Sequence, residues 1–143
     1  MASFIDSNVL VYLLSADSRK ADAVQAALQE RAVISVQVLN EVTHVARRKI
    51  AMPWREIEAF LALVRSLCAV EPLTVQSHDL GRKLAEQHKL GVYDSMIVAS
   101  ALLAGCGTLY SEDLQSGRVF DGRLKVVNPF QDAPSLRGAR PLP

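Results

Sequence analysis

The sequence predicts an α/β protein with a small, mainly parallel central sheet and helices on both faces. Short strand candidates alternate with helix candidates along the whole chain, which favours parallel strands joined by helical crossovers. Half of the 143 residues are apolar, enough for one buried core but not for a second domain. Sixteen basic against 15 acidic residues leave a formal net charge of +1, so nucleic-acid binding would require a local basic patch.

The first half of the chain is expected to contain two strands and three helices. Apolar residues at regular spacing and Ser or Asn residues at capping positions mark them. In order they are a strand at 3–6, a helix that Ser7 or Asn8 caps and that runs to Leu14, a helix at 18–31, a strand at 32–34, and a helix at 35–50 that Pro53 stops.

The second half continues the alternation and ends in a proline-rich stretch. We expect an amphipathic helix at 54–69, an edge strand at 70–75 that contains Pro72, a helix at 77–90 closed by Gly91, a helix opened by Asp94 that runs to Ala104, a strand at 108–110, a loop at 111–122 and a strand at 124–127. The chain from Pro129 resembles a loose tail, which gives one domain over residues 1–130 and a flexible segment over 131–143.

Four acidic residues are expected to meet at one edge of this sheet. Asp6 ends the first strand, Glu41 lies early in the helix after the second strand, Asp94 opens the helix before the strand at 108–110, and Asp113 follows that strand. In right-handed crossover units these positions share the carboxyl edge, where open α/β sheets bind their ligands.

Four carboxylates in one place require a cation between them. Two unit charges about 4 Å apart repel by roughly 4 kcal/mol at an effective dielectric constant of 20. An all-oxygen site suits Mg²⁺ or Mn²⁺, whereas zinc favours His or Cys, and the sequence has no CxxC or HExxH pattern. The spacing does not decide between one metal ion and two.

Four segments resemble the motifs of PIN-domain nucleases, in the same order. They are Phe4-Ile5-Asp6-Ser7-Asn8-Val9-Leu10-Val11-Tyr12, Ser35-Val36-Gln37-Val38-Leu39-Asn40-Glu41, Leu90-Gly91-Val92-Tyr93-Asp94-Ser95-Met96-Ile97-Val98-Ala99 and Thr108-Leu109-Tyr110-Ser111-Glu112-Asp113. The resemblance extends from about residue 3 to Phe130 and is specific as a set, and it implies a three-layer α/β/α sandwich.

In its short, single-domain length the chain further resembles the VapC toxins of toxin-antitoxin pairs. This resemblance implies a metal-dependent endoribonuclease, active as a homodimer and inhibited by a small VapB-type antitoxin. It assigns metal ligation and catalysis to Asp6, Glu41, Asp94 and Asp113, with Asn8 and Ser111 as supporting hydrogen-bonding residues. Glu112 is adjacent to Asp113, and the motif favours Asp113 as the fourth acid.

Other functions fit the residues less well. A non-catalytic PIN-like module that binds RNA or protein would usually lack one of the four acids, and all four are present. A receiver-like module would need an aspartate at the end of the strand near Val75, which is missing. A haloacid-dehalogenase phosphatase would need an aspartate where Asn8 stands.

Basic residues near Glu41 are candidates for contact with RNA. Arg47, Arg48 and Lys49 follow Glu41 on the same predicted helix and could hold phosphates, face solvent or contact an antitoxin. His44 lies one turn after Glu41 and could approach the substrate.

The remaining features indicate a cytoplasmic protein. Two cysteines, Cys68 and Cys106, provide no disulfide framework. The first residues do not have the pattern of a signal peptide, and no apolar run approaches the roughly 20 residues of a membrane-spanning helix.

Overall fold

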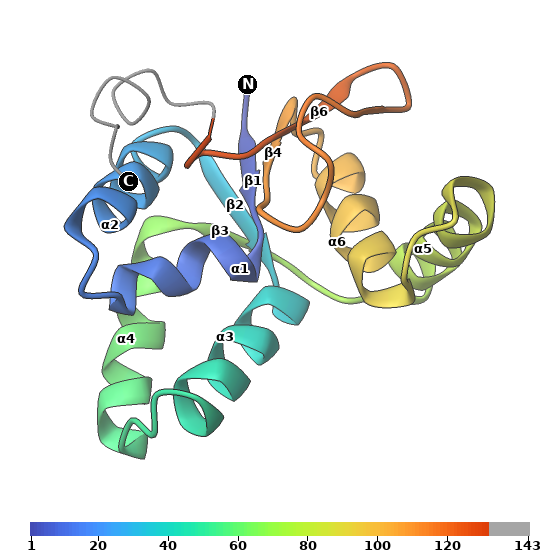
Figure 1. Cartoon of the computed structure of the whole chain (residues 1–143). Helices are drawn as coiled ribbons and strands as arrows, with labels where there is room; N and C mark the ends of the chain where they lie inside the picture. Colours follow the sequence, from blue (N-terminus) through green and yellow to red (C-terminus); the bar gives the residue numbers. More distant parts are fainter. Residues whose placement is uncertain (132–143) are drawn as a thin grey trace.

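The structure, a computed structural model, describes residues 1–131 and is built on one mixed sheet (Figure 1). The six strands lie in the order β3-β2-β1-β4-β6-β5, and all neighbours are parallel except β5 and β6. The strands are β1 (Ser3–Ile5), β2 (Ala32–Ser35), β3 (Ala69–Glu71), β4 (Thr108–Tyr110), β5 (Val119–Phe120) and β6 (Leu124–Val127). The predicted α/β class and the largely parallel sheet are confirmed.

Helices cover both faces of the sheet. Figure 1 shows α1, α2 and α4 on one side and α5 and α6 on the other, which gives the three predicted layers. The helices are α1 (Ser7–Leu10), a 3-10 helix η1 (Val11–Leu14), α2 (Ser18–Leu28), α3 (Val36–Arg48), α4 (Trp54–Leu67), α5 (Val75–His88) and α6 (Val92–Leu103).

The core lies between these layers and fixes the central strands. Phe4, Ile5 and Leu109 are fully buried on the adjacent strands β1 and β4. Helix α6 has buried side chains all round, as its apolar sequence predicts, because it is covered by the sheet on one side and by α5 on the other. The two helices approach closely at Gly81, where a Cβ atom would lie 2.5 Å from the Sδ atom of Met96.

Strand β5 was not expected, because its residues were predicted to belong to a loop. It is a two-residue strand that forms a hairpin with β6, with Phe120 paired to Leu124. The connection contains Asp121 and Gly122, which both have positive φ, at 52° and 66°. A two-residue strand is too short to show an alternating pattern, but the Asp-Gly pair is a sequence signal for a hairpin.

Several predicted element boundaries were wrong by a few residues. The strand expected at 70–75 ends at Glu71, directly before Pro72, and lies at the edge of the sheet as predicted. The next helix begins at Val75, because Thr74 forms a capping box with Ser77. That helix ends at His88, and its C-cap Lys89 has a positive φ of 56°.

Gly91, predicted to close that helix, is the N-cap of α6. Helix α6 therefore begins at Val92, and Asp94 lies in its first turn without capping it. At the start of the chain, the cap of α1 is Asp6 rather than Ser7 or Asn8.

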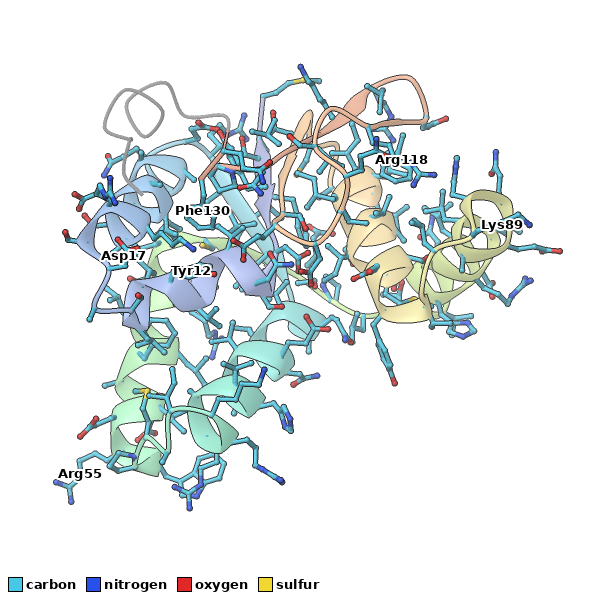
Figure 2. All side chains as sticks on the ribbon, viewed as in Figure 1. Tyr12, Asp17, Arg55, Lys89, Arg118 and Phe130 are labelled. Atoms are coloured by element: carbon cyan, nitrogen blue, oxygen red, sulfur yellow. The ribbon has the colours of Figure 1, made fainter. Side chains whose placement is uncertain are left out.

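The end of the domain is held in place at Phe130. The Phe130 ring packs edge-on against Tyr12 with a centroid distance of 4.7 Å (Figure 2). The loose tail that was expected from Pro129 onward therefore does not include Phe130. The flexible tail predicted for 131–143 lies, apart from Gln131, outside the described residues.

Within residues 1–131, every helix is too short or too polar to cross a lipid bilayer. Cys68 and Cys106 are both free and buried, and burial raises the pKa of each thiol to about 11.

Candidate active site at the carboxyl edge of the sheet

Asp6 lies at the end of the central strand β1 and is almost completely buried, with 3% of its surface exposed. Its backbone N–H donates to the carbonyl of Tyr110 on β4, which continues the sheet by one residue. Its carboxylate caps α1 by accepting a hydrogen bond from the Ser7 N–H at 2.7 Å. The backbone thus fixes Asp6 where β1 and β4 meet the first turn of a helix.

Asp6 forms the floor of an open cleft of about 860 Å³ at this edge of the sheet. All four predicted acids line the cleft, together with Glu112. Glu41 lies on the second turn of α3 and Asp94 on the first turn of α6, and Asp113 lies in the loop after β4. The topology therefore brings the four predicted acids to one cleft, although they are spread over more than 100 residues of the chain.

Their electrostatic influence on one another shows how close the acids are. Burial raises the pKa of Asp6 to about 7, and the charges of Glu41 and Asp94 act in the same direction. Burial also raises the pKa of Asp94, with further contributions from Asp113 and Glu41. The charges of Glu41 and Asp113 thus lie close enough to Asp6 or Asp94 to make the ionisation of these two carboxyl groups less favourable.

Asn8 and Ser111 hold the Asp6 carboxylate from two sides. The Ser111 hydroxyl is fully buried and donates to Asp6 Oδ2 at 2.9 Å, while the Asn8 amide donates to the same oxygen at 3.4 Å. Asn8 also accepts the backbone N–H of Glu112 at 3.0 Å, which connects the first motif to the fourth.

The hydrogen bonds of Glu41 involve two residues that the sequence analysis did not select. The Ser7 hydroxyl donates to Glu41 Oε1 at 2.6 Å and lies 3.4 Å from Asp6 Oδ1, so it bridges the two acids. Gln37 donates to Glu41 Oε2 at 2.8 Å from one helical turn earlier. That contact has a sequence signal, because residues four apart face each other on a helix. The Ser7 bridge has no such sequence signal.

The acidic cleft fits a hard divalent cation in chemistry and position. Its available donors are carboxylate, hydroxyl and amide oxygens, the ligands that Mg²⁺ and Mn²⁺ prefer. A cation would also offset the repulsion that raises the pKa of Asp6 and Asp94.

Metal binding would nevertheless require side-chain rotation. Within residues 1–131, no three His, Cys, Asp or Glu side chains are grouped closely enough to form a complete ligand set. Glu41 accepts one hydrogen bond on each carboxylate oxygen, from Ser7 and Gln37, and each oxygen keeps a second lone pair for a cation.

The basic residues of α3 have different surroundings. Lys49 and His44 line the same cleft as the acids. Arg47 instead donates to the Met52 carbonyl at 3.0 Å and lies over the Trp54 ring at 5.1 Å, at the corner between α3 and α4. Arg47 therefore stabilises that corner.

The structure is an α/β/α sandwich with an acidic cleft at the carboxyl ends of parallel strands, the edge at which open α/β sheets bind their ligands. The family model of the PIN domain matches residues 3–119, and the chain therefore belongs to the PIN domain family. A comparison with curated protein sequences gave no significant match.

Solved structures with a similar fold include a toxin-antitoxin complex and a toxin. A toxin-antitoxin complex from Klebsiella pneumoniae has a TM-score of 0.69 at 21% identity, over 90% of this chain and 98% of that one. FitAcB from Neisseria gonorrhoeae has a TM-score of 0.65 at 17% identity, over 90% and 99%. VapC20 from Mycobacterium tuberculosis, a sarcin-ricin-loop-cleaving toxin, has a TM-score of 0.64 at 18% identity, over 78% and 89%.

The raised pKa of Asp6 predicts that the metal-free protein becomes less stable as the pH rises. Between the usual value of 3.8 and about 7, the folded state keeps a proton that the unfolded chain has released. The free energy of unfolding therefore falls through this window, by roughly 4 kcal/mol for a shift of this size. Urea denaturation in EDTA from about pH 5 to pH 8 should show the fall.

The variant Asp6→Asn should flatten this pH dependence, because an amide does not titrate. Asp79→Asn, on the exposed surface of α5, should keep the wild-type slope. A slope unchanged by Asp6→Asn would contradict the assignment of the raised pKa to Asp6.

Proposed function

We propose that this protein is a Mg²⁺- or Mn²⁺-dependent endoribonuclease that hydrolyses RNA phosphodiester bonds. The observation that carries the proposal is the convergence of Asp6, Glu41, Asp94 and Asp113 on one cleft, where burial and the neighbouring acids raise the pKa of Asp6 and Asp94. Membership of the PIN domain family supports the same reaction class.

In this proposal the four acids hold the cation and the surrounding residues keep them in place. Asp6 is the fixed ligand, because three hydrogen-bonding groups and its position at the end of β1 restrain it. Asn8 and Ser111 orient its carboxylate, and supporting residues of this kind typically contribute about 10- to 100-fold to metal affinity or activity. Glu41, Asp94 and Asp113 complete the set directly or through water.

The bound cation supplies Lewis acidity toward a water molecule and a phosphate oxygen. The carboxylates that would hold it line an open cleft, so a phosphodiester can enter from solvent. No histidine is required for the reaction, and the His44 side chain is exposed on the cleft wall, where it can contact the substrate.

The toxin role is the next step of the proposal. The similar structure from Klebsiella pneumoniae is a toxin-antitoxin complex and that from Mycobacterium tuberculosis is a toxin, and this chain covers 98% and 89% of their lengths. We therefore propose a VapC-type toxin that acts as a cytoplasmic homodimer and is inhibited by a VapB-type antitoxin. A non-catalytic PIN-like binding module remains the second candidate, and the cleavage assay separates the two.

The nuclease proposal predicts that Asp6→Asn or Asp94→Asn abolishes cleavage of RNA in Mg²⁺ or Mn²⁺. The loss should exceed the roughly 10- to 100-fold effect of a supporting residue, because a ligand itself is removed. Gel assays on a mixed RNA substrate measure it, and circular dichroism checks that the fold survives. Asp79→Asn is the matched control, and full activity in both site variants would refute the site.

The position of Lys49 on the cleft predicts that Lys49→Met weakens RNA binding without abolishing cleavage. Loss of one phosphate contact should raise KM, leave kcat nearly unchanged and lower the salt dependence of binding by about 0.7 in log-log slope. Lys83→Met, on the exposed surface of α5, is the charge-matched control. Equal effects of the two variants would show that only net charge matters.

The toxin role predicts that induced expression of the wild-type chain stops bacterial growth, whereas Asp94→Asn does not. Colony counts after induction measure this difference, and equal protein levels on a blot make the comparison valid. Unimpaired growth with active wild-type enzyme would remove the toxin role and leave the nuclease.

A further inference from the structure

The adjacent acids Glu112 and Asp113 have different surroundings. Glu112 Oε1 accepts a hydrogen bond from the Tyr12 hydroxyl at 3.0 Å, and Oε2 lies 3.9 Å from Lys20 Nζ. Asp113 is exposed, and its charge acts on Asp94 across the cleft. Both carboxylate oxygens of Glu112 are therefore engaged by Tyr12 and Lys20, whereas Asp113 is exposed, although both residues line the cleft.

Lys20 is held in place by aromatic rings as well as by Glu112. Its Nζ atom lies 4.4 Å from the centroid of the Tyr12 ring and 5.3 Å from that of Phe130. The same atom donates to the Tyr12 hydroxyl at 3.4 Å. A cation over two ring faces is attracted by both and loses less entropy on pairing than a free lysine.

These contacts join four segments that are distant in the sequence. Tyr12 lies on η1, Lys20 on α2, Glu112 after β4, and Phe130 after β6. Figure 2 shows Tyr12 and Phe130 side by side next to α1, and their rings meet edge-on at 4.7 Å. We refer to these four residues as the Glu112 clamp.

The loop that the clamp holds carries the fourth acid. Its start is fixed by the Ser111 hydroxyl on Asp6 and by the Ser111 N–H, which donates to the Val127 carbonyl. The backbone N–H of Glu112 donates to Asn8, and its side chain is bound by Tyr12 and Lys20. The next residue, Asp113, therefore follows a residue restrained at both its backbone and its side chain.

We propose that Glu112 is a positioning residue, not a metal ligand, and that the Glu112 clamp fixes the loop so that Asp113 faces Asp94. The effect of the clamp on catalysis rests on the proposed nuclease function, but the clamp itself is a property of the metal-free chain. The proposal also gives different roles to Glu112 and Asp113, which are adjacent in the sequence motif.

The clamp predicts that the loop loosens when any one contact is removed. Tyr12→Phe removes the hydroxyl that binds Glu112, and Glu112→Gln removes the charge that attracts Lys20 while keeping an acceptor. Each variant should speed hydrogen exchange of the Asp113 and Leu114 amides in EDTA by roughly three- to tenfold. The double variant should exchange little faster than the faster single variant, because both changes break one unit.

Glu86→Gln on the exposed face of α5 is the control and should leave these amides unchanged. Lys20→Met tests the clamp from its third member and should also speed exchange. Exchange rates that are unaffected in all three clamp variants, or that multiply in the double variant, would overturn the proposal.

A second measurement separates positioning from ligation. Titration with Mn²⁺ alone, followed by electron paramagnetic resonance, should show at least tenfold weaker binding for Asp113→Asn and no more than about threefold for Glu112→Gln. Equal loss in both variants would make Glu112 a ligand and refute the proposal.

If the wild-type chain binds no Mn²⁺ at all, the proposed nuclease function fails, and the exchange experiment still decides whether the clamp exists. In the active enzyme, Glu112→Gln should lower kcat and leave KM for RNA nearly unchanged, because the clamp orients Asp113 and does not touch the substrate.

Discussion

The burial of the Asp6 carboxylate is the constraint on which the rest of the site depends. A charged group at the end of a central strand is costly unless hydrogen bonds and a counter-charge compensate it. The chain supplies the hydrogen bonds through Ser7, Asn8 and Ser111, and it places Glu41 and Asp94 where they make the charge still less favourable. The structure therefore tolerates an unfavourable charge in the place where a cation would offset it.

The same negative cleft has to accept a negatively charged substrate. Five acids line it, and the net charge of +1 gives the whole molecule almost no attraction for RNA. Without a cation, a phosphate would be repelled by the residues proposed to act on it. In the proposed function the cation therefore offsets the charge of the substrate phosphate as well as that of the acids, and Lys49 adds a positive charge at the edge of the cleft.

The sequence predicted the layers, the parallel sheet and the edge at which the acids gather, because hydrophobic periodicity and chain order determine these features. It did not predict β5, since two residues show no pattern, although the Asp121-Gly122 turn marked the hairpin. Helix ends were misplaced at Thr74 and Gly91, where the capping side chain or backbone angle decides between adjacent residues.

The candidate site likewise contains residues that the sequence predicted and contacts that it did not predict. Asp6, Glu41, Asp94 and Asp113 were selected from order and spacing, and the contact between Gln37 and Glu41 follows from helical periodicity. The Ser7 bridge and the contacts of Glu112 join residues separated by 34 to 104 positions, so no local pattern reports them. Such partners become visible only when the backbone is folded.

The hairpin and the segment after it have a practical consequence for the limits of the domain. The family match ends at residue 119, yet the Val127 carbonyl holds the loop that carries the fourth acid, and the Phe130 ring packs against Tyr12. A fragment cut at the end of the family match would lack β6, which pairs with β4 beside that loop. Expression fragments and domain boundaries drawn for this chain should therefore extend through Phe130.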